Sequence, residues 1–213
     1  MSNKNSSLYD FYQHFILKGK CMALGKQAKV LSKPQIEMIS NYLLTKRNGL
    51  RNQTIFLLSA RAGLRAKEIS ALTWEMVVTS EGMISDEIHL TDTASKGKGG
   101  RVIPMHKSIR TNLDLIRAKH GADGFVIKSE RSSSVSPQMI VNIFRGWYSE
   151  LGLVGCSSHS GRRTFVTNAA QKISLVGGSI RDVQALAGHS SLQTTQRYIE
   201  VNADAQKKLI NLL

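Results

Sequence analysis

Tyr198 follows the glycine–histidine pair of GHSSLQTTQRYIEV by nine residues, near the end of a strongly basic chain. A phenol with an ordinary pKa of about 10 is a weak nucleophile at neutral pH and needs neighbouring groups to activate it. If its target were a phosphodiester, the transition state would need fixed cations on its non-bridging oxygens. Arginine suits this best, because its charged fork binds two oxygens at once. An acid would also have to protonate the leaving alkoxide.

Candidate partners for Tyr198 occur where predicted helices begin and end. Arg65 follows the glycine that ends one helix and opens the next, where Glu68 is within reach to brace it. His159 and Arg162 are three residues apart and share a helical face if the helix already includes His159. His189 lies in a tight joint between two helices.

A lysine could supply the proton for the leaving group. Lys96 and Lys98 lie at the tip of a glycine-rich hairpin in SKGKGGRVIPM, and either could reach into a groove. Each candidate also has an ordinary explanation. Most arginines on helices are surface residues, a histidine after a helix often pairs with the helix dipole, and a hairpin lysine is usually solvated. A tyrosine on a helix is usually a packing or surface residue, so no single candidate indicates catalysis.

Apolar spacing predicts that helices position these residues. The helical segments are 31–44, 51–63, 66–74, 108–121, 136–151, 159–173 and 179–188, followed by a last helix that carries Tyr198. Alternating segments at 87–91 and 101–105 flank the glycine-rich loop and predict antiparallel strands. The fold class is therefore mainly α with a small three-stranded antiparallel β-sheet (α+β). Residues 1–30 are predicted to form a basic arm, and residues 31–213 one domain.

Local signals predict the ends of the last two helices. Ser179 and Asp182 form a capping box for one of them, and Gly188 ends it. Ser190 is predicted to open the helix that carries Tyr198, in a second capping box.

The charge of the chain predicts a polyanionic partner. Lys and Arg number 29 against 15 Asp and Glu, which gives a formal net charge of +14. Nucleic acid is the first expectation and an anionic membrane surface the second. No apolar run approaches the roughly 18 residues of a spanning helix, and no secretory signal is evident, so we expect a cytoplasmic protein without a membrane partner. Cys21 and Cys156 lie far apart, as unpaired thiols of a reducing compartment commonly do.

Four segments in order resemble the conserved boxes of the tyrosine recombinase (phage integrase) family. They are AGLRAKEISALTW, SKGKGGRVIPM, HSGRRTF and LAGHSSLQTTQRYIEV. The resemblance covers about residues 30 to 213, and it implies the catalytic-domain fold of that family. The box around Tyr198 is the most specific of the four, whereas GLR followed by a glutamate is weak alone.

The resemblance implies a catalytic set and a reaction. The matching residues are Arg65, Lys96, His159, Arg162, His189 and Tyr198. Lys96 matches the hairpin lysine by gap-free spacing to Arg101, and Lys98 stays open as the alternative acid. In this family the tyrosine attacks a phosphate of double-stranded DNA and leaves a 3′-phosphotyrosyl link, whose bond energy makes ATP, metal and other cofactors unnecessary. The implied partners are DNA and further copies of the chain, in a homodimer or homotetramer on DNA.

The chain departs from the family pattern in three places, one of which is a slightly longer KISLVGGSI stretch between Arg162 and His189. Arg163 stands where many members carry histidine, and about 30 residues before the domain are too few for the usual helical DNA-clamping domain. Two other functions fit parts of the pattern: a type IB topoisomerase-like enzyme, and a DNA-binding regulator with a decayed site. A metal-dependent nuclease is disfavoured because no carboxylate cluster is evident. The phosphate loop of nucleotide-driven enzymes and the usual zinc motifs are also missing from the sequence.

Overall fold

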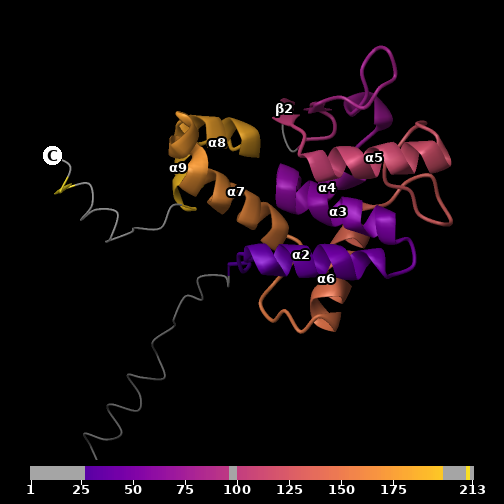
Figure 1. The fold of residues 1–213 in the computed structure, drawn as a ribbon, viewed down its shortest axis with the longest axis horizontal. Helices are drawn as coiled ribbons and strands as arrows, with labels where there is room; N and C mark the ends of the chain where they lie inside the picture. The colour runs from indigo at the N-terminus through magenta and orange to yellow at the C-terminus, as the bar shows by residue number, and fades with distance from the viewer. Residues whose placement is uncertain (1–26, 96–99, 199–209, 212–213) are drawn as a thin grey trace, which may run out of the picture.

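The computed structural model describes residues 27–95, 100–198 and 210–211 of the chain (Figure 1). Its elements are α2 Lys33–Leu44, α3 Gly49–Ala62, α4 Ala66–Ser70, η1 Trp74–Met76, β1 Glu87–Leu90, β2 Arg101–Pro104, α5 Lys107–His120, α6 Pro137–Glu150, α7 Ser160–Lys172, η2 Ile173–Val176, α8 Ile180–Ala187 and α9 Leu192–Gln196. The predicted mainly α fold is confirmed. Of the predicted basic arm, residues 1–26 lie outside the described residues.

The helices form two groups of unequal size. Figure 1 shows α2 to α6 gathered on one side, while α7 leads to α8 and α9 on the other. The main apolar core is built from residues between Leu31 and Tyr148. A second cluster consists of Val166, Val183 and Ala187 with partly buried neighbours, one of which is Tyr198. Because so few side chains are buried there, α8 and α9 depend on more than apolar packing to hold their place.

The sheet has two strands in the described part of the chain, whereas three were predicted. β1 and β2 pair antiparallel, with Leu90 opposite Arg101 and Glu87 opposite Pro104. In the described residues the chain before β1 makes isolated bridges only, one between Val78 and Ile84 and one between Thr73 and Phe125. The 3₁₀ turn η1 ends just before the first of these bridges, so the ladder has no room to lengthen into a third strand.

Side-chain caps mark the starts of several helices, among them α2 and α8. Ser32 and Gln35 form a capping box at the start of α2. Ser179 and Asp182 form the predicted box at the start of α8, and Gly188 ends that helix with a left-handed φ of 59°. The two predictions for α8 are confirmed.

The start of α9 differs from the prediction. Its N-cap is Ser191 instead of Ser190, and the Ser191 side chain makes no capping hydrogen bond. The helix ends at Gln196, so Tyr198 lies in the turn that follows it. With a span of only five residues, α9 is held by its contacts with α8 more than by its own caps.

In the described ranges we find no helix that combines the length and the apolar character needed to cross a membrane.

Candidate active site

The first turn of α7 lies directly against α3, and a glycine allows this approach. A Cβ atom on Gly161 would lie 2.5 Å from the Ser59 hydroxyl oxygen and 3.2 Å from the backbone nitrogen of Ala60. His159 is the N-cap residue of α7, and Arg162 stands in its first turn. Close packing of the two helices therefore brings Arg162 to the end of α3.

Arg162 joins the ends of two helices from a buried position. Its side chain donates from Nη1 to the carbonyl of Gly63, after α3, at 2.5 Å, and from Nη2 to that of Ala187, at the end of α8, at 2.6 Å. Burial, and then the charge of Arg65, lower the pKa of Arg162 to about 10. The guanidinium thus stays protonated at neutral pH although only 5% of the residue is exposed.

Arg65 is held by the buried carboxylate of Glu68, as the sequence predicted. The backbone nitrogen of Arg65 donates to Glu68 Oε2 at 2.8 Å, and Nη1 donates to Oε1 at 2.8 Å. Burial acts to raise the pKa of Glu68, but the hydrogen bonds from Arg101 and Arg65 outweigh it and hold the pKa below its ordinary value. Glu68 is therefore ionised and fixes the direction of the Arg65 side chain.

Three arginines converge on the end of α8. Arg101 Nε donates to the carbonyl of Leu186 at 3.0 Å. Arg162 Nη2 donates to the next carbonyl, that of Ala187, at 2.6 Å. Arg65 Nη2 donates to the carbonyl of Gly188 at 3.4 Å. Unpaired carbonyls at a helix C-terminus carry partial negative charge, so cations are stabilising there. These contacts supply the polar anchoring that the small second cluster lacks.

His189 lies just beyond this anchored helix end. Its Nδ1 is 3.0 Å from the hydroxyl of the buried Thr195, and its backbone exchanges hydrogen bonds with Gln184 at 3.0 and 3.1 Å. Burial, followed by the charges of Arg162, Arg65 and Arg101, lowers the pKa of His189 to about 4. The imidazole is therefore neutral at pH 7 and able to accept or donate one hydrogen bond.

The ring of Tyr198 stacks on that imidazole. The two ring centres are 5.7 Å apart, and the planes differ by 20°. The guanidinium carbon of Arg163 lies 5.7 Å from the centre of the same phenol ring. Tyr198 also packs against the second apolar cluster, so its ring serves a packing role as well.

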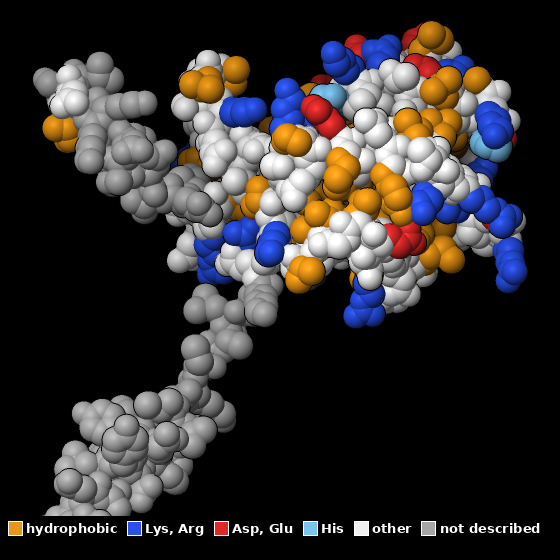
Figure 2. Space-filling model, turned by 60° about the horizontal axis from the view of Figure 1, so that its bottom comes forward, with side chains coloured by type: hydrophobic (Ala, Val, Ile, Leu, Met, Phe, Trp, Pro, Cys, Tyr) orange, Lys and Arg blue, Asp and Glu red, His pale blue; other side chains and the backbone are white. Residues whose placement is uncertain are grey.

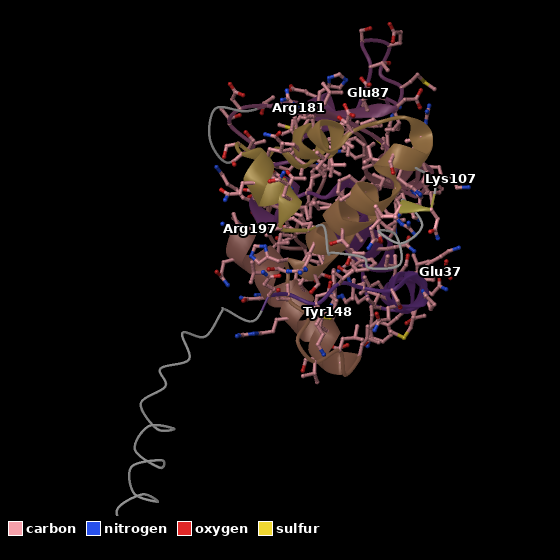
Figure 3. The ribbon with its side chains drawn as sticks, turned by 90° about the vertical axis from the view of Figure 1, so that its left-hand side faces the viewer. Glu37, Glu87, Lys107, Tyr148, Arg181 and Arg197 are labelled. Carbon is pink, nitrogen blue, oxygen red and sulfur yellow. The ribbon has the colours of Figure 1, made fainter. Side chains whose placement is uncertain are left out.

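A cavity of about 360 Å³ opens beside Tyr198. Its lining residues are Gln27, Ala28, Ser157, His159, Arg162, Arg163, Thr194, Arg197 and Tyr198. Among the described residues, arginines and a histidine line it and no carboxylate does, so an anion would be attracted there. Figure 3 views the molecule from the side where α8 and α9 lie, and Arg197 and Arg181 are on that side.

Five of the six predicted site residues are thus brought together. Arg65, Arg162, His189 and Tyr198 are linked through the end of α8, and His159 shares the cavity with Arg162 and Tyr198. The sixth, Lys96, lies outside the described residues, as does the alternative Lys98. The catalytic role of all six stays a prediction.

Two structural partners of the site were not singled out from the sequence. Arg101 binds Glu68, and Thr195 binds His189. Thr195 stands six residues after His189 with no local pattern to mark it, and the Arg101–Glu68 pair spans 33 residues. Among the described residues, no group of three or more His, Cys, Asp or Glu side chains is arranged to hold a metal ion.

Known proteins share this sequence pattern and fold. The model of the phage integrase family matches residues 29–205. A tyrosine recombinase XerC of Herpetosiphon aurantiacus is 27% identical over 84% of this chain and 58% of its own length. A tyrosine recombinase XerD of Listeria monocytogenes is 28% identical over 92% of this chain and 69% of its own length.

Solved structures agree on the fold. The Tn1549 transposon integrase, solved in complex with a circular intermediate DNA, has a TM-score of 0.67 and 17% identity, over 86% of this chain and 65% of that one. The present chain thus spans under two thirds of the XerC relative and of the Tn1549 chain. Since the family model covers most of the sequence, the chain belongs to the phage integrase family.

Proposed function

We propose that this protein is a site-specific DNA recombinase that cuts and rejoins DNA strands through a 3′-phosphotyrosyl intermediate. Membership of the phage integrase family and relatives named tyrosine recombinases support this function. So does the solved complex of the Tn1549 integrase with DNA.

One observation carries the proposal: a neutral imidazole, two arginines and a phenol from four separate segments meet at the end of α8. Arg65 and Arg162 each donate to a carbonyl there, and Tyr198 stacks on His189 in the turn beyond. A structural role alone would account for the arginine contacts with carbonyls. It would not account for a cavity that opens beside both Arg162 and Tyr198 and whose described lining contains no carboxylate.

The proposed step transfers a DNA strand to the enzyme. The Tyr198 oxygen forms a bond to phosphorus, and the bond from phosphorus to the 5′ oxygen breaks. The phenol proton passes to an imidazole of the site, and the leaving oxygen takes a proton from Lys96, with Lys98 as the alternative. Arg65 and Arg162 stabilise the charge on the non-bridging oxygens, where loss of one such donor typically costs about a hundredfold in rate.

We further propose double-stranded DNA as the partner, with two or four copies of the chain on paired sites. Figure 2 supports the choice of DNA, since Lys and Arg side chains are spread over the face it shows and Asp and Glu are few. The division into an arm at residues 1–30 and a catalytic domain at 31–213 belongs to the same proposal.

The test is covalent capture from a library of short duplexes with randomised sequence. Short duplexes release a small piece after cleavage, so the phosphotyrosyl link cannot be reversed and accumulates. After denaturation in SDS, DNA that remains attached to the protein is recovered and sequenced. Wild-type protein should give an adduct and an enriched site, whereas Tyr198→Phe should bind the same DNA and give none.

The other outcomes separate the alternatives. An adduct from Tyr198→Phe would remove Tyr198 from its role. DNA binding without any adduct from the wild type would reject strand cleavage and favour a decayed regulator. Adducts without an enriched sequence, combined with relaxation of supercoiled plasmid, would favour a type IB topoisomerase-like enzyme.

A further inference from the structure

Arg101, the first residue of β2, makes a two-pronged ion pair with Glu68. Its Nη1 donates to Oε1 at 2.9 Å and its Nη2 to Oε2 at 3.0 Å. A paired fork of this kind fixes the plane of the carboxylate as well as its position. Glu68 is completely buried, so its direction depends on the groups that bind it.

The same carboxylate holds Arg65. Arg65 Nη1 donates to Glu68 Oε1, the oxygen that also accepts from Arg101 Nη1. If Arg101 were lost, Glu68 could turn toward Arg65 alone, and the guanidinium of Arg65 would turn with it. Arg101 therefore sets the orientation of Arg65 indirectly, through Glu68.

Arg101 also reaches the helix end that precedes His189. Its Nε donates to the carbonyl of Leu186 at 3.0 Å. The Arg101 side chain fills the space beside Gly188, where a Cβ atom would lie 2.8 Å from Nη1 and 3.0 Å from Cδ. One side chain therefore connects the support of Arg65 to the support of His189.

Arg101 is poorly placed to touch DNA itself. Its side chain is 8% exposed, whereas that of Arg65 is 25% exposed. All three of its nitrogens donate to protein oxygens. These contacts distinguish it from a residue that binds phosphate.

We propose that Arg101 is a positioning residue for strand cleavage, which fixes Glu68, and through it Arg65, against the end of α8 that carries His189. The role rests on the proposed recombinase function. Arg101 lies five residues after Lys96 and is the first residue of β2. The strand that follows the predicted acid is therefore anchored to Glu68 and to the end of α8.

The first experiment follows His189 in the free protein by NMR. In Arg101→Gln, the imidazole resonances should shift, and the pKa of His189 should rise from about 4 toward its ordinary value, because a cation and an anchoring bond are both lost. Arg101→Lys keeps a charge beside Glu68 but cannot bind Leu186 and Glu68 with a fork, so it should shift the resonances too. This second variant serves if Arg101→Gln does not fold.

Ile103→Ala is the matched control. Ile103 lies on the same strand, two residues on, and is buried in the main apolar core instead of the second cluster that Tyr198 packs against. It should lose stability and leave the His189 resonances unchanged. Unchanged resonances in a folded Arg101 variant would overturn the proposal.

The second experiment measures cleavage of the captured duplexes. Arg101→Gln should slow adduct formation on the order of tenfold or more, without changing the salt dependence of binding, because no phosphate contact is lost. In an Arg65→Lys background the same change should cost less than about threefold, since both changes act on one group. If the double variant lost rate by the product of the two single-variant factors, Arg101 would act independently of Arg65, which contradicts the proposal.

The two experiments fail in different ways. Absence of an adduct from the wild type would reject the proposed function, while the NMR comparison would still decide whether Arg101 positions His189. A wild-type adduct with a normal rate in Arg101→Gln would reject the positioning role and leave the proposed function intact.

Discussion

Arg163 differs from an ordinary arginine on a helix surface because its side chain lies beside the ring of Tyr198 and is partly buried. Its Nη1 donates to Gln27, and its guanidinium carbon lies 5.7 Å from the centre of the Tyr198 ring. Its buried Nε has no hydrogen-bond partner in the described structure. A cation over a phenol ring contributes about 1 kcal/mol when partly desolvated, so Arg163 helps to hold the ring in place.

Replacement of Arg163 should therefore slow cleavage more than it weakens binding. Arg163→Gln should lower the rate of adduct formation on the order of five- to tenfold, which corresponds to the loss of about 1 kcal/mol. Arg181→Gln is the control, because Arg181 is an exposed arginine on α8 without a contact to Tyr198. Equal rates for both variants in single-turnover assays would show that the contact with the ring is incidental.

At the scale of elements, the joint between α8 and α9 depends on Gly188. This residue has φ of 59°, and a side chain there would meet Arg101. Gly188→Ala should destabilise the fold by more than the roughly 1 kcal/mol of a left-handed alanine, and it should slow cleavage. Gly177→Ala is the control, since Gly177 has φ of 76° and open space around it. If both variants lose equal stability in denaturant titrations and cleave alike, the contact with Arg101 is unimportant.

The same joint predicts a pH dependence of stability. The folded pKa of His189 is about 4, below the ordinary value of about 6.5. Between these values the unfolded chain binds more protons at this position, so the free energy of unfolding rises with pH through that window and falls as the solution is acidified. Between pH 7 and pH 4.5, the melting temperature of the wild type should fall further than that of His189→Gln. His120→Gln, at the exposed end of α5, is the control and should follow the wild type.

At the scale of the whole molecule, the net charge of +14 should govern the encounter with the DNA that we propose as partner. Each phosphate that the protein neutralises contributes about −0.9 to the slope of log K against log salt concentration. Contact with about five phosphates would give a slope of about −4.5, and we expect a slope at least this steep in binding titrations on the captured duplexes. A slope near zero would indicate that the excess charge lies away from the DNA.

Local signals explain why the helices could be predicted. The Ser179–Asp182 capping box and the Gly188 helix end involve residues within four positions of each other, so short sequence windows contain the whole cause. The start of α9 was predicted one residue early, because its boundary is set by docking on α8 and no side-chain cap marks it. The prediction of a third strand was wrong for a similar reason, since the chain before β1 makes isolated bridges and no further strand in the described structure.

The sequence by itself determined the helical architecture, the basic charge and the family boxes with their predicted residues. Each of these depends on composition or on short spacings, which tertiary packing does not alter. Only the tertiary structure decided which side chains hold the site in place. Arg101 binds Glu68, 33 residues away in the sequence, and Leu186, 85 residues away. Arg162 binds the carbonyl of Gly63, 99 residues away. A guanidinium can bind any nearby oxygen, so its partners are fixed by which helix ends are buried beside it.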